Sequence, residues 1–536
     1  MYLLKNYKMK KYILKTAAIA FVVAGSFNSC TKKLDLQPTN DVTAAIAYAT
    51  PMGYKQNLAK VYGAFALTGN NGAGSGDIAG IDPGTSDFFR LFWKAQELST
   101  DEAVVAWGDP GIQDFHLMNW SSTNPMLQGL YYRSLYQITL ANDFIRQSTD
   151  AMVASRGITG ADADNIKKYS FEARFIRAYQ YWVLMDLFGN PPFITEVDIV
   201  GVTIPKQTTR AALFTYVETE LKTIETNMIA AKANEYGRAD MAACQALLAR
   251  LYLNAKVYTG TAKNNEAITY AKKVIDGGYS LISDYTQLML ADNHTNTSEN
   301  ILTINYDGLK TQNWGATTFL THASIGGSMN AGNYGVDGGW YGLRTTKALV
   351  NKFTGGFPNV DKRAQFYTSG QNLEINDLTQ FNDGYAITKY RNKTKAGANG
   401  SSLAWVDIDM PIFRLGEMYL VYAEAVVDGG TTGDIATATT YINNLRQRAY
   451  GNITGNVVAA QLTADFILDE RARELMWEGF RRTDLIRHNK FVEATYLWPW
   501  KGGSKDGTSV ASFRKLFPIP STDLASNPNL KQNTGY

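Results

Sequence analysis

Histidine and carboxylate side chains are the first candidates for chemistry, because they serve as acids, bases and metal ligands. The chain holds four histidines and 49 acidic residues. The histidines lack the spacing of metal ligands, so each is expected to be a surface or hydrogen-bonded residue: His116, His294, His322 and His488. The sequence contains no nucleophile elbow, H-E-x-x-H helix, Walker A loop or dinucleotide-binding glycine motif. Two carboxylates across a cleft would still suffice for glycoside hydrolysis, and sequence alone leaves that alternative open.

One loop has the oxygen-rich composition that calcium prefers. Asp292, Asn296 and Glu299 lie within eight residues of one another, although their spacing differs from that of an EF-hand. Most acidic loops are simply solvated. The sequence therefore predicts no cofactor, with calcium at this loop as the alternative.

Cys30 follows a segment with the order of a bacterial export signal. Five lysines and no acidic residue occur in residues 1–29, and an apolar run from Ala17 to Ala24 follows the lysines. No stretch of the chain reaches the ~20 apolar residues of a transmembrane helix. We therefore expect residues 1–29 to be a lipoprotein signal peptide and Cys30 to be acylated. An ordinary secretory signal with an incidental cysteine is the alternative.

The charge balance excludes one class of partner. The net charge of +3 includes the five leader lysines, and their removal leaves 47 basic against 49 acidic side chains. A chain that is nearly neutral, without a basic stripe, has no electrostatic basis for binding nucleic acid. Cys244 is the only cysteine besides Cys30. If Cys30 is acylated, no internal disulfide can form.

Helical periodicity dominates the segments that must position any site. Apolar residues recur at helical spacing in 126–147 and 170–190, and Gly189 to Pro192 end the second helix. Residues 239–276 resemble a tetratricopeptide helix pair, with small residues at the crossing and a turn at Gly260. Further helices are expected at 411–427, 435–448 and 464–491.

Two other segments have distinctive compositions. The last predicted helix is rich in arginine, and ion pairs within it are expected between Glu474 or Glu478 and Arg471, Arg481 or Arg482. By contrast, residues 292–408 are rich in Gly, Asn and Tyr and show little sustained period. Long loops of this kind in a compact domain are usually functional.

Several segments together resemble the SusD/RagB family of outer-membrane glycan-binding lipoproteins. The segments that match occur in the family's order and, with the leader, span almost the whole chain: EARFIRAYQYWVLMDLFGNPPFIT, MPIFRLGEMYLVYAEAVV, YINNLRQRAYG, ERARELMWEGFRRTDLIRHNKF and FPIPSTDLASNPNLKQNTGY. Further segments are similar to the family's starch-utilisation members: ELSTDEAVVAW, GRADMAACQALLARLYLNAKVYTG, KTQNWGATTFL and LWPWKGGSKDGTSVASF.

The resemblance implies a mostly α fold, with four tetratricopeptide-like helix pairs as a scaffold. A single domain would cover residues 30–536, with helices mainly at 40–280 and 411–495 and a loop-rich ligand region at about 292–408. It further implies a lipid-anchored protein on the outer membrane, at the cell surface. The expected function is binding of an α-glucan, such as starch or a related glucan, and its delivery to a SusC-type TonB-dependent β-barrel transporter.

The resemblance also implies which residues contact the sugar. Flat aromatic rings cover the apolar faces of a neutral oligosaccharide, and planar polar groups bind its hydroxyls. Trp314 and Trp340 fall at two stacking positions of the family's starch-utilisation members, and Arg90 falls at a hydroxyl-binding position. Their third aromatic and an amide are replaced here by Val105 and Pro110. Trp107 and Asp109 complete the predicted site by proximity in sequence, with burial of Trp107 in the core as the alternative. Tyr334 and Tyr341 are weaker candidates on proximity alone.

These predictions describe a binding protein without catalytic activity. Two alternatives remain, a glycoside hydrolase acting on the same polysaccharide and a purely structural surface protein. The first needs a pair of carboxylates near the sugar. The second would not need paired tryptophans in glycine-rich loops.

Overall fold

The computed structural model describes residues 43–199, 201–353 and 360–536. The chain divides into two compact units, Met1–Tyr54 and Lys55–Tyr536. The described part of the first contains α2 (Ala44–Ala47) and the start of α3 (Pro51–Ala66). The predicted signal peptide and Cys30 lie outside the described residues. In the described ranges, no helix is both long enough and apolar enough to span a bilayer. Everything below concerns the second unit.

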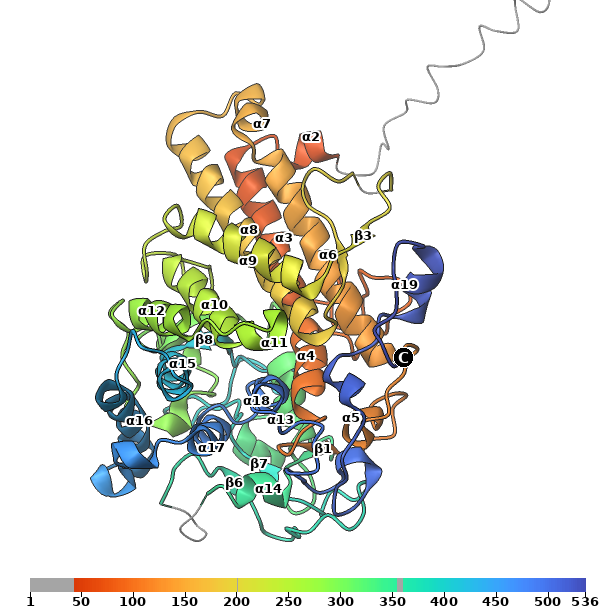
Figure 1. The fold of residues 1–536 in the computed structure, drawn as a ribbon. Coiled ribbons are helices and arrows are strands. Elements are labelled where there is room, and N and C mark those ends of the chain that lie inside the picture. The colour runs from red at the N-terminus through yellow and green to blue at the C-terminus, as the bar shows by residue number, and fades with distance from the viewer. Residues whose placement is uncertain (1–42, 200, 354–359) are drawn as a thin grey trace, which may run out of the picture. The chain divides into compact units, whose positions relative to one another are not determined.

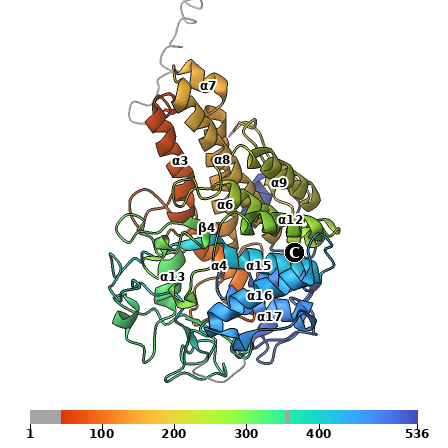
Figure 2. The same ribbon diagram turned by 90° about the vertical axis from the view of Figure 1, so that its left-hand side faces the viewer.

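A run of neighbouring helices forms the scaffold of this unit. Helix α6 packs on α8, α8 on α9, α10 on α12, α12 on α15 and α15 on α16, as Figures 1 and 2 show. These helices are α6 (Pro125–Gln147), α8 (Gly160–Leu187), α9 (Arg210–Glu225), α10 (Met241–Leu253), α12 (Asn264–Ile275), α15 (Leu415–Val427) and α16 (Ile435–Tyr450). The predicted mostly α, helix-pair fold is confirmed.

Local sequence explains where these helices begin and end. The Asn124 side chain accepts hydrogen bonds from backbone N–H groups in the first turn of α6. Pro125 is the first residue of this helix and has no backbone N–H that would need a partner. Gly189 follows α8 with a φ of +74°, and Gly260 ends the short helix α11 (Ala255–Thr259) with a φ of +81°. Both positions require the left-handed backbone that glycine adopts most easily.

The remaining elements are short. The helices are α4 (Phe88–Glu97), α5 (Asp114–Leu117), α7 (Asp150–Ser155), α13 (Ala316–Ala323), α14 (Lys347–Val350), α17 (Ala464–Glu474), α18 (Arg481–Arg487) and α19 (Ser521–Ser526). The strands form antiparallel pairs: β1 (Val104–Val105) with β5 (Leu343–Arg344), β2 (Pro192–Phe193) with β3 (Lys206–Gln207), β4 (Asn300–Ile304) with β8 (Met410–Arg414), and β6 (Phe366–Tyr367) with β7 (Ala386–Ile387).

Two predicted helices are wrong in part. The helix expected at 411–427 begins only at Leu415, because residues 410–414 pair as β8 with β4. The helix expected at 464–491 is broken between α17 and α18. Trp477 and Gly479 both have positive φ, +61° and +87°, at the break. Trp477 is fully buried there, and its indole nitrogen donates to the carbonyl of Glu102 at 3.1 Å. Tertiary packing overrides the helical period.

The predicted ion pairs within the arginine-rich segment are also wrong. Glu474 pairs with Arg363, Arg414 and Arg448, all from other segments. Glu478 pairs with Lys389 and Arg414. The arginines of the segment likewise find other partners: Arg471 pairs with Asp484 and Arg481 with Asp101, whereas Arg482 donates to the carbonyl of Lys515. Apart from the pair of Arg471 and Asp484, these partners lie outside residues 464–491.

The ionic groups around Glu474 form a buried cluster, which we call the charge cluster: Glu299, Arg363, Arg414, Arg448, Glu474 and Glu478. Each is at most 7% exposed. Arg414 lies 2.7 Å from carboxylate oxygens of both Glu474 and Glu478, and Arg448 lies 2.7 Å from Glu299. Buried charges are stable only when paired in this way. The cluster joins α16, β8 and the C-terminal end of α17 to the loop residues Glu299, Arg363 and Glu478.

The charge cluster predicts loss of stability in acid. Burial alone would raise the pKa of Glu474, but the charges of Arg448, Arg414 and Arg363 outweigh it and lower the pKa to about 2. A carboxyl with a lowered folded pKa stabilises the fold above its unfolded pKa and loses that contribution as pH falls. We expect a loss of about 3 kcal/mol from this group between pH 4.5 and 2, at about 1.4 kcal/mol per pKa unit.

Carboxyls with a raised pKa act in the opposite direction at higher pH, among them Asp87 and Glu102. Burial raises the pKa of Asp87 to about 6 and that of Glu102 to about 7, so both favour folding as pH falls toward 4. Below about pH 4 they are protonated in both states and contribute no further change. Thermal melting followed by circular dichroism should therefore show its steepest decline between pH 4 and 2. A melting temperature that stays constant in that range would contradict the prediction.

Candidate functional site

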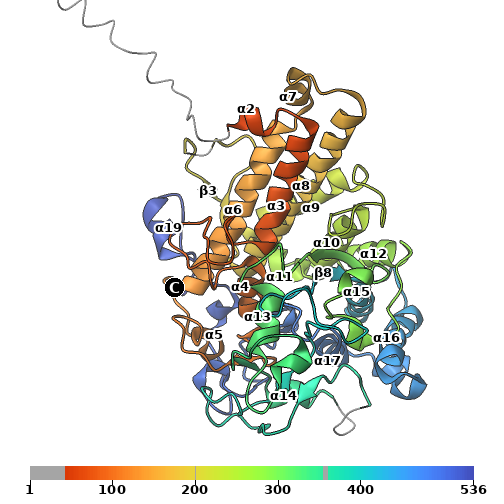
Figure 3. The ribbon, with the colours of Figure 1, turned by 180° about the vertical axis from the view of Figure 1, so that it is seen from behind.

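The N-termini of α4 and α13 meet at one carboxylate. Asp87 accepts hydrogen bonds from the backbone N–H of Arg90 at 2.9 Å and of Ala316 at 3.0 Å. Gly315 makes this approach possible, because a Cβ at that position would lie 2.0 Å from the Cβ of Asp87. The shared carboxylate fixes Trp314 directly before α13. Figure 3 shows α13 beside α4.

The segment 340–344 lies against the other end of α13. The N–H of Trp340 donates to the carbonyl of His322 at 2.8 Å, and that of Gly342 donates to Ala323 at 2.9 Å. The pairing of β1 with β5 then brings Trp107 to the same place, where its indole nitrogen donates to the carbonyl of Trp340 at 2.9 Å. A Cβ at Gly342 would lie 2.5 Å from the Trp107 ring, so glycine is required there.

Four tryptophans form a continuous group, the tryptophan cluster: Trp107, Trp340, Trp314 and Trp405. Their ring centroids are 6.4 Å apart for Trp107 and Trp340, 6.1 Å for Trp340 and Trp314, and 5.5 Å for Trp314 and Trp405. Neighbouring rings are tilted by 44–56°, and each side chain is partly exposed. The cluster therefore offers a row of apolar surfaces in several orientations.

His322 supports the central ring. Its imidazole stacks on Trp340 with centroids 4.7 Å apart and planes 19° from parallel. The Nδ1 atom lies 2.8 Å from the carbonyl of Gly338, and Nε2 is buried without a hydrogen-bond partner in the described residues. Burial lowers the pKa of His322, which favours the neutral ring. His322 is therefore a hydrogen-bonded histidine, one of the two predicted possibilities. It is buried, and its ring supports Trp340.

Arg90 lies behind the cluster. It is 6% exposed, and its Nη1 donates to the carbonyls of Trp314 at 2.6 Å and Gly84 at 3.0 Å. Its guanidinium lies 4.5 Å from the centre of the Phe319 ring, and Nε is buried without a partner among the described residues. Burial lowers the pKa of Arg90 to about 10, so it remains charged. Arg90 therefore holds Trp314 in place, and a direct contact with sugar stays a prediction.

The other sequence candidates are less closely placed. Asp109 and Pro110 are exposed, and Val105 is fully buried in β1. Tyr341 is 53% exposed, and its ring packs edge-on against Phe381 at 5.7 Å rather than against a tryptophan. The structure thus brings Trp107, Trp314, Trp340 and Arg90 together and leaves Asp109 and Tyr341 at the periphery.

Sequence reasoning missed two members of this site. Trp405 follows a glycine- and serine-rich segment, as Trp314 and Trp340 adjoin glycines, so the same criterion could have identified it. His322 had no such signal. Its role depends on the end of α13 meeting residues 338–342, a contact that no local pattern specifies.

Two buried ionisable groups near α13 are not arranged for catalysis. Asp87 has the raised pKa of a potential acid, but it is 1% exposed and one oxygen holds two backbone N–H groups. Lys94 is fully buried, and burial lowers its pKa well below the usual range. Neither group is accessible to a substrate. Both positions favour a structural role.

The loop that is the alternative calcium site makes other contacts. Asp292 accepts from the backbone N–H of Lys395 at 3.1 Å, and the amine of Lys395 donates to Asn296 at 2.8 Å. Glu299 is fully buried and pairs with Arg448 and Arg414 in the charge cluster. Across the residues that the structure describes, no group of three or more His, Cys, Asp or Glu side chains could hold a metal ion. The expectation of no cofactor, with calcium at this loop as the alternative, stays a prediction.

Comparison with known proteins gives consistent results. Residues 359–536 match the SusD family. The chain is 35% identical to the starch-binding protein SusD of Bacteroides thetaiotaomicron, in a match that covers 98% of this chain and 99% of that protein. SusD-like protein P25 of Formosa agariphila is 24% identical, over 68% of this chain and 72% of that protein.

Solved structures share the fold. Surface glycan-binding protein A of Bacteroides thetaiotaomicron, in complex with laminarihexaose, superposes with a TM-score of 0.68 at 21% identity, over 90% of this chain and 99% of that one. A SusD superfamily protein of Parabacteroides distasonis gives 0.70 at 21% identity, over 92% and 100%. At these identities the likeness concerns the fold.

Proposed function

Because the chain belongs to the SusD family, we propose that it binds a neutral glycan through the tryptophan cluster and catalyses no reaction on it. The observation that carries this proposal is the row of four partly exposed indoles in the loops around α13. Indoles bind the C–H faces of sugar rings, and the surrounding polar groups contact hydroxyls. A row of this kind matches a chain of several sugar units.

The proposed ligand is an α-glucan such as starch or a related glucan. The relative with 35% identity is a starch-binding protein, which supports this choice. Val105 removes one aromatic position of the starch-utilisation members, and Trp405 extends the row beside Trp314. One end of the glycan is therefore expected to lie over Trp405.

Binding without hydrolysis can be tested on the purified protein. Calorimetric titration with maltoheptaose should give a measurable affinity, and incubation with starch should release no reducing sugar. A separate titration with laminarihexaose reports whether a β-linked glucan also binds. Release of reducing sugar by the pure protein would favour the glycoside hydrolase instead. Absence of binding to both oligosaccharides would contradict the proposal.

The proposal includes a location and a partner. Acylated Cys30 would anchor the mature chain on the outer membrane, at the cell surface, since several acyl chains give stable attachment. A SusC-type TonB-dependent β-barrel transporter would then receive the glycan. Affinity from a few stacked rings, each worth about 1–2 kcal/mol, is modest enough to permit release to such a partner. Loss of membrane association in a Cys30→Ser variant tests the anchor.

A further inference from the structure

Aliphatic side chains gather on the loop between β2 and β3. Four of them, all within residues 197–204, are 57–79% exposed, and we call them the aliphatic patch: Val197, Ile199, Val202 and Ile204. Single exposed apolar residues are common on protein surfaces, but an exposed group of this kind indicates a surface that binds an apolar partner. The apolar surface continues into a groove of about 390 Å³ between the loop, α6 and α19, where Leu135, Pro192 and Ile194 contribute to the lining.

The backbone of this loop is held on both of its arms. Arg146 donates from Nε to the carbonyl of Glu196 at 2.9 Å and from Nη2 to that of Asp198 at 3.0 Å. On the other arm, Asn527 donates to the carbonyl of Pro205 at 2.9 Å. The loop therefore presents its aliphatic side chains from an anchored backbone. An apolar partner can bind them at little cost in conformational entropy.

The polar groups of the loop suit a lipid surface. Glu196 forms an ion pair with Arg177, and Asp198 accepts from the backbone N–H of Thr195 at 2.9 Å, so both carboxylates have partners. Lys206, at the foot of the loop, is exposed and can approach headgroup phosphates. Protein interfaces favour aromatic residues, Met and Arg. The sequence of residues 195–199 and 201–205 contains none of these.

The chain enters this unit at the same end of α6. Gln137 of α6 donates to the carbonyl of Val61 in α3 at 2.8 Å. Arg133, one turn earlier in α6, donates to the carbonyl of Thr68, which follows α3. The two helices therefore run antiparallel, and Lys55, the first residue of the unit, lies toward the C-terminal end of α6. The loop is held at that end too (Figure 1).

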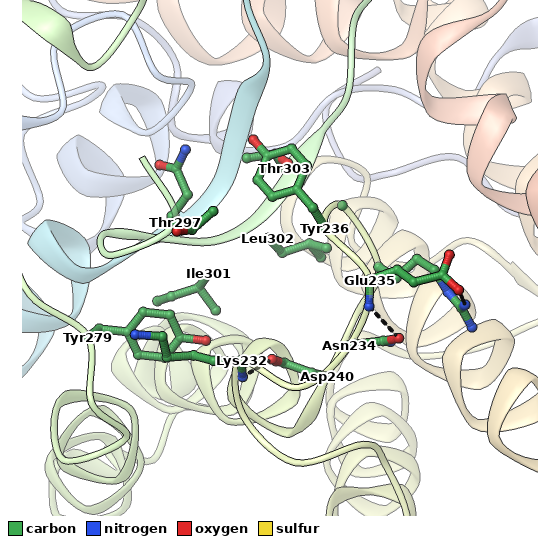
Figure 4. Close-up of a pocket in the computed structure, with 13 residues that line it drawn as sticks. Lys232, Asn234, Glu235, Tyr236, Asp240, Tyr279, Thr297, Ile301, Leu302 and Thr303 are labelled. Atoms are coloured by element: carbon green, nitrogen blue, oxygen red, sulfur yellow. Dashed lines mark hydrogen bonds and ion pairs between the residues drawn. The ribbon is translucent and has the colours of Figure 1, made fainter. Parts of the chain in front are cut away.

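An ion pair fixes Lys55 at the surface of the unit. Its amine lies 2.8 Å from the carboxylate of Glu235, and both side chains are about half exposed. Figure 4 shows Glu235 beside Asn234 on the segment that joins α9 to α10. Residues 31–54 separate Lys55 from Cys30. Acyl groups on Cys30 would therefore hold this end of the unit, with the aliphatic patch, toward the bilayer.

From these features we propose that the aliphatic patch contacts the lipid bilayer to which the protein is anchored. This inference rests on the proposed acylation of Cys30. The four side chains would lie among the outermost acyl groups, with Lys206 beside the headgroups. Acyl chains on a single residue leave the protein free to turn about that residue. A second contact determines which face of the protein points to the membrane, and thereby how the tryptophan cluster is presented.

A fluorescent probe on the loop tests this contact. The protein is the mature chain, residues 30–536, with Cys30→Ser, so that no acyl group contributes. Cys244 is buried, so an introduced cysteine is labelled selectively with the environment-sensitive dye NBD. On Val202→Cys, the dye should brighten and shift to the blue when vesicles of phosphatidylcholine and phosphatidylglycerol are added. Ile453→Cys is the control, because Ile453 is 71% exposed, close to the 76% of Val202, and should give no change.

Flotation with the same vesicles measures the contribution of the whole patch. The variant Val197→Ser/Ile199→Ser/Val202→Ser/Ile204→Ser should reduce the bound fraction about tenfold or more, because it removes the apolar groups that leave water. The control Ile453→Ser/Val458→Ser removes two equally exposed aliphatic side chains and should bind as the unsubstituted chain does. Maltoheptaose affinity should be the same in both variants, so this test and that of glycan binding fail independently.

Three outcomes would overturn the proposal. The first is an unchanged dye on Val202→Cys after addition of vesicles. The second is an equal change at both labelled positions, which would indicate adsorption of the chain without a preferred face. The third is a change on Val202→Cys that follows protein concentration without vesicles, which would assign the patch to a second copy of the chain. The Cys30 anchor is tested separately, by the membrane association of the acylated protein.

Discussion

Replacing Trp340 by alanine should weaken maltoheptaose binding about tenfold, and the double variant Trp314→Ala/Trp340→Ala should abolish detectable binding. One indole stacked on a sugar is worth about 1–2 kcal/mol, and 1.4 kcal/mol is a factor of ten in affinity. Trp340 is the central ring, since it contacts Trp107 on one side and Trp314 on the other. Its removal also uncovers His322. Calorimetric titration of both variants measures the effect.

A matched control separates stacking on sugar from stability. Tyr419 is a partly buried aromatic residue on α15 that stacks on Tyr441 at 4.6 Å. Tyr419→Ala removes a comparable ring from the helical scaffold and should leave affinity unchanged. Circular dichroism should show the same helical content in all variants. Full affinity in the tryptophan double variant would move the glycan site elsewhere.

Replacing Glu474 by alanine should destabilise the fold by about 3–5 kcal/mol. The carboxylate is fully buried and pairs with Arg363, Arg414 and Arg448. Its removal leaves an excess of buried positive charge without a counterion. We expect a lower midpoint in urea unfolding and a melting temperature lowered by several degrees.

The control for this variant is a carboxylate on the surface. Asp276 lies 2.8 Å from Lys272, one helical turn away, and both side chains are about half exposed. Such pairs contribute less than about 0.5 kcal/mol, so Asp276→Ala should unfold at nearly the wild-type urea concentration. If both variants lowered the unfolding midpoint equally, burial of the charge cluster would contribute nothing to the free energy of unfolding.

Local sequence patterns predict the helices well and their interruptions poorly. The helix expected at 126–147 is observed as Pro125–Gln147, because apolar spacing and an asparagine cap act within a few residues. The expected helix at 464–491 breaks at Trp477 and Gly479 because Trp477 is drawn into the core. Such a break depends on residues near position 100, hundreds of residues away. No window of local sequence contains that information.

The candidate site was likewise predicted in part from the sequence and in part only revealed by the fold. Composition and family resemblance point to Trp314, Trp340 and Arg90, which do lie together. They do not distinguish a ring that faces solvent from a guanidinium that is buried and bonded to a backbone carbonyl, as Arg90 is. They also cannot place Trp405 beside Trp314, because 91 residues separate them in the chain and only the fold brings them into contact.

The close spacing of the four indoles has an optical consequence. Tryptophan rings this close can exchange excitation energy, so we expect the emission of the four indoles to be coupled. A ligand that covers any one ring changes the emission of all four. Six other tryptophans contribute a background. The protein thereby carries an intrinsic fluorescent reporter at the surface where the glycan is proposed to lie.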